Sequence, residues 1–198
     1  AACFSPWNGP ALLFGRKIAE ALAAGCSCIV KPAEETPGTA LEIVQALADA
    51  GVPAGVVNVV FGVPSEVSTH LISSPIIRKV SFTGSVEVGR TLARLAGEHL
   101  KRITLELGGH GPVIVCDDAD VKQVVEQAVG AKFFVAGQIC VSPTRFLVHE
   151  SIHDEFVRVF AERAAAIKLG DGFDPTTQMG PLANQRRLTA MEQFVADA

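Results

Sequence analysis

Cys140 lies in a local sequence that is typical of a reactive thiol. It ends the polar, glycine-containing stretch Gly137-Gln138-Ile139-Cys140, which directly follows a helical pattern. Cys26, Cys28 and Cys116 occur instead in strand-like apolar runs, where a cysteine packs as a small hydrophobe. A loop cysteine can ionise to a thiolate and attack an electrophilic carbon. The sequence therefore predicts a nucleophile at Cys140 and core packing for the other three.

Two predicted strand ends carry residues suited to a nucleotide. Ser81-Phe82-Thr83-Gly84-Ser85 leaves a strand and enters a helix, so it offers free N–H groups, a hydroxyl and the positive end of the helix to a pyrophosphate. The fingerprint G-x-G-x-x-G is absent, and Gly-Ser is also an ordinary helix start. Lys31-Pro32-Ala33-Glu34 follows another strand, where it could bind ribose hydroxyls or form a solvated loop.

The sequence matches a zinc-binding motif, but the predicted secondary structure does not suit zinc binding. His149-Glu150-Ser151-Ile152-His153 matches H-E-x-x-H, which binds zinc when both histidines lie on one helix face. Here His149 ends a predicted strand and Ser151 is the expected start of the next helix. The pair Cys26-x-Cys28 has no second pair to complete a metal site. We expect no metal.

The elements that must position these residues alternate between strands and helices. Gly25 fits the end of the first helix, and Asp120 with Gln123 fits the start of a later one. Alternation at this spacing predicts an α/β fold with right-handed crossovers and a largely parallel sheet. Gly108-Gly109 is the candidate hinge between two domains. Strands are expected over 26–30, 56–61, 79–82, 103–107, 113–115 and 145–148; helices over 11–24, 36–51 (capped by Thr36), from 65, 86–95, 120–135 and 152–167, with a last helix-like pattern over 188–195.

Composition excludes several classes of function. A net charge of −4 offers no field for nucleic acid, and 48% hydrophobic residues are typical of a globular domain. The longest stretch without a charge or histidine, 50–65, is too short and too broken by Pro and Gly to span a membrane. Five cysteines, an odd number without a secretory signal, predict reduced thiols and a cytoplasmic protein. The chain starts at Ala1 without Met, so we expect it to be a piece of something longer.

Five ordered motifs resemble the aldehyde dehydrogenase superfamily: Pro6-Trp7-Asn8, Lys31-Pro32-Ala33-Glu34, Phe82-Thr83-Gly84-Ser85, Leu105-Glu106-Leu107-Gly108-Gly109 and Gly137-Gln138-Ile139-Cys140. The resemblance covers the whole chain but only the middle of the family's length. It implies a parallel Rossmann-like NAD-binding domain over 1–108, lacking its N-terminal part, and the start of an α/β catalytic domain over 109–198. It also implies that the parent protein is a homo-oligomer.

The resemblance assigns roles to the matching residues. Cys140 is then the nucleophile, Asn8 the side-chain donor to the oxyanion, and Glu106 the general base that activates water to hydrolyse a thioester. The cofactor is NAD, with NADP as the other candidate. The residues placed around it are Lys31, Glu34, Gly84, Ser85, Trp7 and Gly108.

Two further positions concern the substrate, a small-molecule aldehyde. Arg16 matches an arginine with which succinate-semialdehyde dehydrogenases hold a carboxylate, and this branch of the family is the most similar. Those enzymes carry a second arginine six residues before the nucleophile, where this chain has Phe134. A semialdehyde is therefore one candidate among aldehydes. The competing hypothesis is an inactive nucleotide-binding or interaction fragment of such an enzyme.

Overall fold

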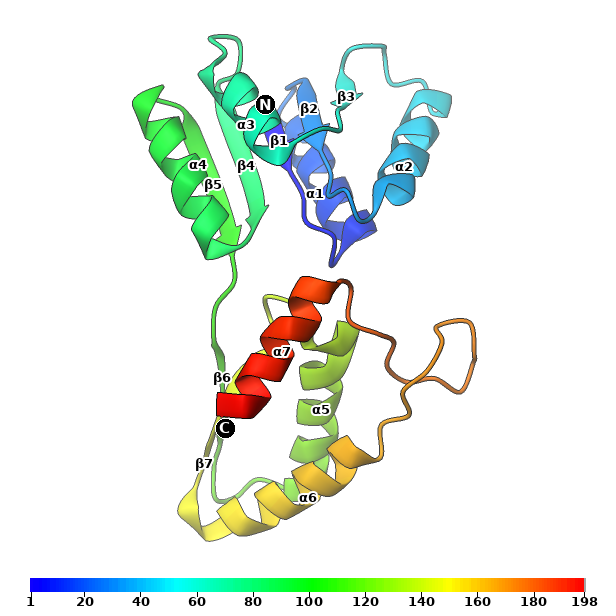
Figure 1. Cartoon of the computed structure of the whole chain (residues 1–198), viewed down its shortest axis with the longest axis vertical. Coiled ribbons are helices and arrows are strands. Elements are labelled where there is room, and N and C mark those ends of the chain that lie inside the picture. Colours follow the sequence, from blue (N-terminus) through cyan, green and yellow to red (C-terminus); the bar gives the residue numbers. More distant parts are fainter. Residues whose placement is uncertain (198) are drawn as a thin grey trace. The chain divides into compact units, whose positions relative to one another are not determined.

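Five parallel strands form the centre of the first of two units into which the chain divides, Ala1–Gly108 (Figure 1). This computed structural model describes residues 1–197. The strand order is β3 (Val57–Val59), β2 (Cys28–Lys31), β1 (Ala2–Phe4), β4 (Lys79–Gly84) and β5 (Arg102–Leu107). The chain starts at the central strand, builds one side, and then crosses to the other side. The predicted parallel α/β sheet is confirmed.

Helices cover both faces of this sheet. Successive residues of β1 point to opposite faces of the sheet, because side chains alternate along a strand. Cys3 packs with α1 (Pro10–Ala23) and α2 (Pro37–Asp49). Ala2 and Phe4 pack with α3 (Pro64–Ser73) and α4 (Val86–Glu98). The unit is therefore a three-layer, doubly wound domain.

Local signals explain where several helices begin and end. Gly25 has a φ of 69°, the left-handed conformation that ends α1. The Ser85 hydroxyl accepts a hydrogen bond from the Val88 N–H at 3.3 Å and so caps α4. Thr36 is the N-cap of α2 and Pro37 its first residue, as predicted, but the Thr36 side chain makes no capping hydrogen bond. Pro37, which suits the first helical position, therefore marks the start.

The second unit, from Gly109 onward, has a two-stranded parallel sheet of β6 (Gly111–Val115) and β7 (Pro143–Val148). One face packs against α5 (Val121–Phe133) and α6 (His153–Ala165). Ring contacts among Phe133, Phe146, Phe156 and Phe160, with centroids 5.2–6.5 Å apart, fill this core. The predicted cap of α5 is confirmed, because Asp120 Oδ1 accepts from the Gln123 N–H at 3.0 Å.

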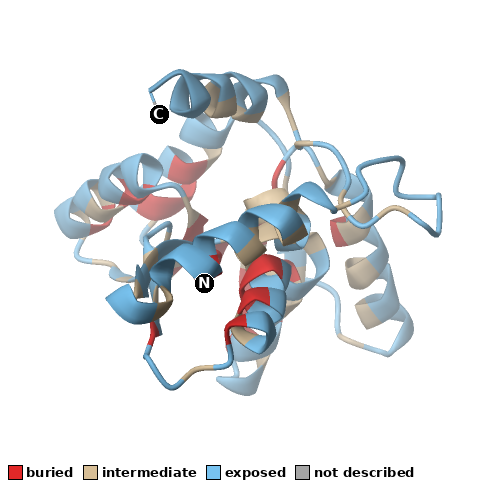
Figure 2. Cartoon of the chain, turned by 90° about the horizontal axis from the view of Figure 1, so that it is seen from below, coloured by how far each residue is buried: buried red, intermediate tan, exposed pale blue. Residues whose placement is uncertain are grey.

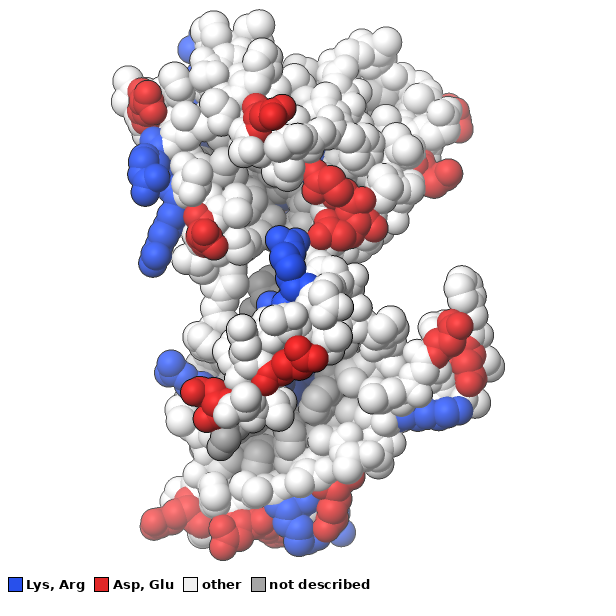
Figure 3. Space-filling model, in the orientation of Figure 1, with Lys and Arg blue, Asp and Glu red and all other residues white. Residues whose placement is uncertain are grey.

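The remaining helices of this unit lie at its surface. A short 3₁₀ helix, η2 (Glu150–Ile152), precedes α6, and α7 (Gln185–Asp197) ends the described chain. None of the described residues of α7 is buried (Figure 2). On α6, acidic and basic side chains lie beside one another (Figure 3), including the pair Arg158–Glu162 at 3.0 Å. Arg163 binds Glu126 of α5 at 2.6 Å and so joins the two helices.

Three expectations need correction. The helix predicted to reach Val135 stops at Phe133, and a 3₁₀ helix, η1 (Phe134–Gly137), follows it. Cys26 and Cys116 were expected in strands, but both are exposed and lie just outside β2 and β6. The two runs were apolar enough for strands, yet the pairing with neighbouring strands begins after Cys26 and ends before Cys116. Only Cys28 of the three packs in the core.

Candidate active site

The predicted nucleotide-binding residues share one edge of the first unit's sheet. All five strands are parallel, so their carboxyl ends meet at one edge. Trp7 and Asn8 follow β1, Glu34 follows β2, Ser85 follows β4, and Gly108 follows β5. The strand order reverses between β1 and β4, and the crevice at such a point is where ligands bind in this class of sheet.

Lys31 and Glu34 form an ion pair at the end of β2. The Lys31 side chain is buried, whereas that of Glu34 is 49% exposed. Lys31 Nζ also donates to the carbonyl oxygen of Pro32 at 3.2 Å. The pair fixes the lysine and leaves an exposed carboxylate at the sheet edge, where it could accept hydrogen bonds from hydroxyl groups.

Two glycines at the turn from β4 into α4 and in the first turn of α4 let side chains of β4 and β5 pack against the backbone. A Cβ on Gly84 would stand 2.5 Å from Cζ of the Phe82 ring, and one on Gly89 would stand 2.6 Å from Cδ2 of Leu107. Both glycines therefore permit contacts that a side chain would block. The first N–H groups of a helix have no partner within it, so the start of α4 after Ser85 is suited to a phosphate. The residues present fit a dinucleotide.

Glu106 projects from β5 to the face opposite the apolar core of that strand. Its neighbours Leu105 and Leu107 pack toward α4, and Glu106 is exposed. Glu106 pairs in register with Thr83, two residues from Ser81, which binds Lys17 of α1, so Glu106 lies on the face of the sheet that faces Lys17. The face of β4 and β5 that carries Glu106 is polar.

Sequence reasoning missed Lys17, whose position in an apolar helix carried no signal of burial. Lys17 is 6% exposed, and its Nζ donates to the Ser81 hydroxyl at 3.0 Å. Burial lowers the pKa of Lys17 below its ordinary value of 10.5, and the charges of Cys3, Glu20 and Glu106 oppose this. A buried cation thus lies beneath the polar face.

Arg16 lies next to Lys17 on α1 but points to the surface. Its side chain is 72% exposed and pairs with Glu20 at 3.1 Å, one helical turn away. The pair engages Nε of Arg16 through one carboxylate oxygen of Glu20, and the rest of the exposed guanidinium could bind a substrate carboxylate.

Cys140 lies in the second unit, in a turn between η1 and β7. Its residue is exposed, as are Cys26 and Cys116, while Cys3 and Cys28 are buried. Burial raises the pKa of Cys3 to about 11 and also raises that of Cys28, which keeps both thiols protonated near neutral pH. As the proposed nucleophile, Cys140 therefore has to be distinguished from two other accessible thiols, Cys26 and Cys116.

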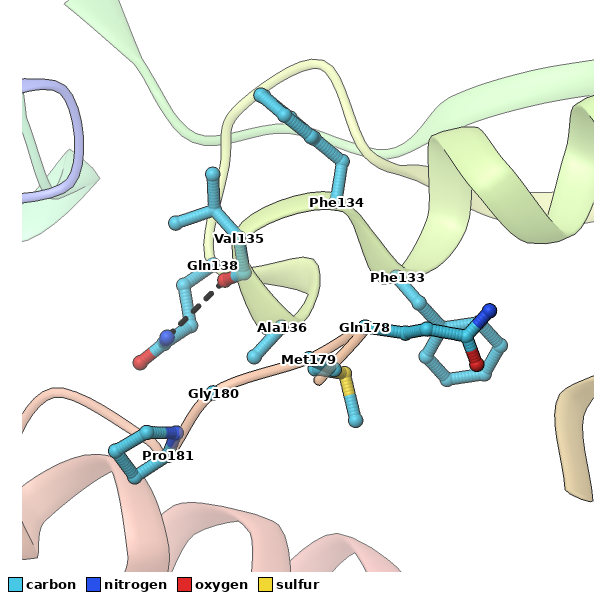
Figure 4. A pocket seen from close by; sticks show the side chains of 9 residues that line it. All are labelled: Phe133, Phe134, Val135, Ala136, Gln138, Gln178, Met179, Gly180 and Pro181. Carbon is cyan, nitrogen blue, oxygen red and sulfur yellow. Dashed lines mark hydrogen bonds between the residues drawn. The ribbon is translucent and has the colours of Figure 1, made fainter. Parts of the chain in front are cut away.

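A pocket of about 340 Å³ lies beside the segment that leads to Cys140 (Figure 4). One wall is the end of α5 with η1, and the other is the segment from Gln178 to Pro181. The Phe134 side chain is 62% exposed and starts from the first of these walls. The lining residues are Phe133, Phe134, Val135, Ala136, Gln138, Gln178, Met179, Gly180 and Pro181.

No metal centre is formed by the described residues, since residues 1–197 contain no group of three or more His, Cys, Asp or Glu placed to hold an ion. His149 precedes η2 and its Nδ1 accepts from the Ser151 N–H at 3.3 Å, whereas His153 begins α6. The prediction that these two rings do not share a helix face is confirmed. Within the same residues, no helix is long and apolar enough to cross a bilayer.

Comparison with known proteins connects the whole chain to one family. Residues 1–198 match the model of the aldehyde dehydrogenase family. A putative 4-(hydroxymethyl)benzenesulfonate dehydrogenase, TsaD2 of Comamonas testosteroni, is 52% identical over 98% of this chain and 41% of its own length. The NADP(+) succinate-semialdehyde dehydrogenase GabD of Escherichia coli is 43% identical over 100% of this chain and 41% of its own.

Solved structures agree with these relatives. The crystal structure of succinate-semialdehyde dehydrogenase from Burkholderia pseudomallei has a TM-score of 0.97 and 45% identity, over 100% of this chain and 41% of that one. Betaine aldehyde dehydrogenase from Staphylococcus aureus, solved with NAD+, has a TM-score of 0.95 and 39% identity, over 98% and 39%. The chain spans about two fifths of the length of the relatives it matches. It belongs to the aldehyde dehydrogenase family.

Proposed function

We propose that the chain supplies the cofactor-binding sheet edge and the nucleophile of an NAD(P)-dependent aldehyde dehydrogenase. The observation that carries the proposal is the gathering of Asn8, Glu34 and Ser85 at one sheet edge in a chain that matches the family over residues 1–198. Relatives and solved neighbours are named for NADP(+) or were solved with NAD+. Because the chain covers two fifths of these relatives, the activity is proposed for the full-length protein.

The Cys140 thiolate attacks the aldehyde carbon and forms a C–S bond, which places a negative charge on the former carbonyl oxygen. The Asn8 side-chain amide and the Cys140 backbone N–H donate hydrogen bonds to this oxyanion. Donors fixed where charge develops are effective, and loss of one costs roughly 10²–10³ in rate. An exposed thiol is a prerequisite for this step, and Cys140 is exposed.

NAD(P)+ held at the sheet edge would supply the hydride acceptor. Loss of hydride from the former aldehyde carbon leaves the acyl group on Cys140 as a thioester. Glu106 takes a proton from water, the resulting hydroxide attacks the thioester carbon, and the Cys140 thiolate departs with release of the acid. The exposed, polar setting of Glu106 on β5 supports a role that requires water. The resemblance supports hydrolysis in particular, because members that transfer the acyl group to coenzyme A tend to lack this glutamate.

The cofactor is held by both sides of the sheet's crevice. The start of α4, with Gly84 and Ser85, takes the pyrophosphate. Glu34 accepts hydrogen bonds from the adenine ribose, and its negative charge favours NAD over NADP. Trp7 and Gly108 line the crevice at the ends of β1 and β5, and Lys31 holds Glu34 in place.

The substrate is an aldehyde that carries an acidic group, a semialdehyde being one class. Two relatives are named for succinate semialdehyde and for a benzenesulfonate, and both compounds carry an acidic group apart from the oxidised carbon. Arg16 is the candidate partner for that group, through the guanidinium nitrogens other than the Nε that binds Glu20. Phe134 presents an aromatic surface where the semialdehyde branch has a second arginine, which favours a substrate with one arginine contact.

The test is Cys140→Ala in the full-length protein, with Cys116→Ala as the matched control, because Cys116 is an exposed thiol of the same unit. NADH formation is followed with NAD and a panel of aldehydes and semialdehydes. We expect Cys140→Ala to abolish oxidation, cofactor binding to survive, and Cys116→Ala to keep the parent rate. More than a few per cent residual activity in Cys140→Ala refutes the assignment. An inactive parent that still binds NAD supports the alternative of a binding protein.

A further inference from the structure

Three consecutive residues just before Cys140 adopt the left-handed conformation. Val135, Ala136 and Gly137 have φ values of 53°, 54° and 71°. Glycine tolerates this conformation, but an alanine does so poorly and a β-branched valine worse still. Among the described residues, Leu100 is the only other non-glycine residue with a positive φ. Such a run persists only where its surroundings hold it in place.

Gln138 binds the left-handed run through its side-chain nitrogen and binds a distant segment through its side-chain oxygen. Its backbone N–H and its Nε2 both donate to the carbonyl oxygen of Val135, each at 3.1 Å. Its Oε1 accepts from the Ala183 N–H at 3.0 Å. Figure 4 shows the Gln138 side chain folded back toward Val135. The amide therefore joins the left-handed run to the segment that leads into α7.

A second tie closes the other side of the Cys140 turn. Ser142 is 3% exposed, and its hydroxyl donates to the carbonyl oxygen of Lys132, in the last turn of α5, at 3.1 Å. A Cβ on Gly137 would lie 3.2 Å from the same Lys132 oxygen, so the chain passes close to the helix end. Cys140 lies between these two ties. Its backbone is fixed on both sides while its residue stays exposed.

We propose that Gln138 is a positioning residue for Cys140: by holding the Val135-Ala136-Gly137 run in its left-handed form, it sets the presentation of the thiol. The proposal rests on the proposed function of Cys140. Gln138 does not act on the substrate, because both atoms of its amide group are engaged by the chain itself. Its contact with Ala183 makes the presentation of the thiol depend on the segment before α7.

The experiment is a double-mutant cycle in the full-length protein with Gln138→Leu and Val135→Asn. Asparagine adopts the left-handed conformation more readily than valine, so it should keep the run in place with less help from Gln138. We expect Gln138→Leu to lower the rate constant of the NADH burst at least tenfold with little change in aldehyde KM, since a misplacement of 1 Å can cost about 10²-fold. In the Val135→Asn background the same change should cost less than threefold.

Controls separate this inference from the function on which it rests. Gln45→Leu removes a hydrogen-bonded glutamine from the surface of α2, where Nε2 donates to Asp49, and should leave the burst unchanged. Cys140→Ser should have no burst; if it keeps one, the proposed function fails. If Cys140→Ser is inactive but Gln138→Leu keeps the parent burst, or loses as much in both backgrounds, the positioning role is refuted.

Two further measurements keep the test decisive if Gln138→Leu does not fold. Gln138→Glu keeps the acceptor for Ala183 but removes the donor to Val135, and should lower the burst at least tenfold. Val135→Asn should raise the thermal midpoint of the full-length protein by about 1 °C, because relief of modest strain shifts the midpoint less as the chain lengthens. No rise in the midpoint would show that the run is not strained and would overturn the proposal.

Discussion

We expect the buried thiol of Cys3 to make the first unit less stable as the pH rises into the alkaline range. Cys3 is 1% exposed in β1, and burial, followed by the nearby Cys28, raises its pKa from the ordinary 9.0 to about 11. Below pH 9 the thiol is protonated in both the folded and the unfolded chain. Between pH 9 and 11 the unfolded chain loses this proton while the folded chain keeps it. The free energy of unfolding must therefore fall as the pH rises through this window.

The magnitude follows from the pKa difference. One pKa unit corresponds to about 1.4 kcal/mol, so the shift from 9.0 to about 11 lowers the free energy of unfolding by about 2 kcal/mol at pH 11 and by about 3 kcal/mol above it. Cys3→Ala removes this titration. At pH 8 the variant should be less stable than the parent by about 1 kcal/mol, because one buried heavy atom is lost. By pH 11 the order of the two should be reversed.

Urea unfolding of the 198-residue chain at pH 8, 9, 10 and 11 measures this difference. Trp7 is the only tryptophan and lies in the first unit, so its fluorescence reports on that unit. The chain has no tyrosine, whose ionisation would otherwise overlap this range. Lys17, whose lowered pKa acts in the opposite direction, is electrostatically coupled to Cys3, so the comparison measures the loss of the Cys3 titration together with its effect on Lys17. Parallel stability curves for parent and Cys3→Ala would refute the reasoning.

Three more predictions concern the proposed chemistry. Glu106→Gln should give a burst of NADH followed by turnover slowed roughly 10²–10⁴-fold, since the thioester forms but its water is not activated; loss of the burst in stopped-flow traces would mean an earlier role for Glu106. The parent should prefer NAD, and Glu34→Gln should shift the NADP/NAD ratio of kcat/KM toward NADP roughly tenfold, or about 1.4 kcal/mol, because Lys31 is released from its pair with Glu34; an unchanged ratio contradicts the charge argument. The isolated 198-residue chain should turn over at less than about a tenth of the full-length rate, because a loosened site can lose about 10² and no described residue of α7 is buried; equal rates in a side-by-side assay would show that the site is self-sufficient.

Most elements follow from signals within a few residues of one another. Gly25, Asp120 and Ser85 mark helix ends through their own backbone freedom or side-chain hydrogen bonds, and these act wherever the helix lies. The apolar runs likewise locate the other strands, although the central strand β1 was not predicted and strand edges depend on the neighbouring strand, as Cys26 and Cys116 demonstrate.

The parts that sequence reasoning missed depend on distant contacts. The run at Val135 and Ala136 has residue types that disfavour a left-handed conformation, and it is held through Gln138, whose Oε1 accepts a hydrogen bond from the N–H of Ala183, 45 residues away. Lys17 is buried because Ser81 of β4 receives its ammonium group, which no pattern within α1 reveals. The role of Cys140 was suggested by its loop and by motif resemblance, and it stays a prediction.

The polar row on β5 also protects the sheet from aggregation. In the described sheet β5 is an edge strand, and such edges invite pairing with other chains unless charges interrupt them. Arg102 and Glu106 supply these charges on the face away from the apolar core. Glu106, the proposed base, is thus also expected to oppose pairing of β5 with strands of other chains. With an apolar replacement of Glu106, a loss of activity could come from lost catalysis or from precipitation. Glu106→Gln keeps the edge polar, so a loss of activity in that variant reports on catalysis.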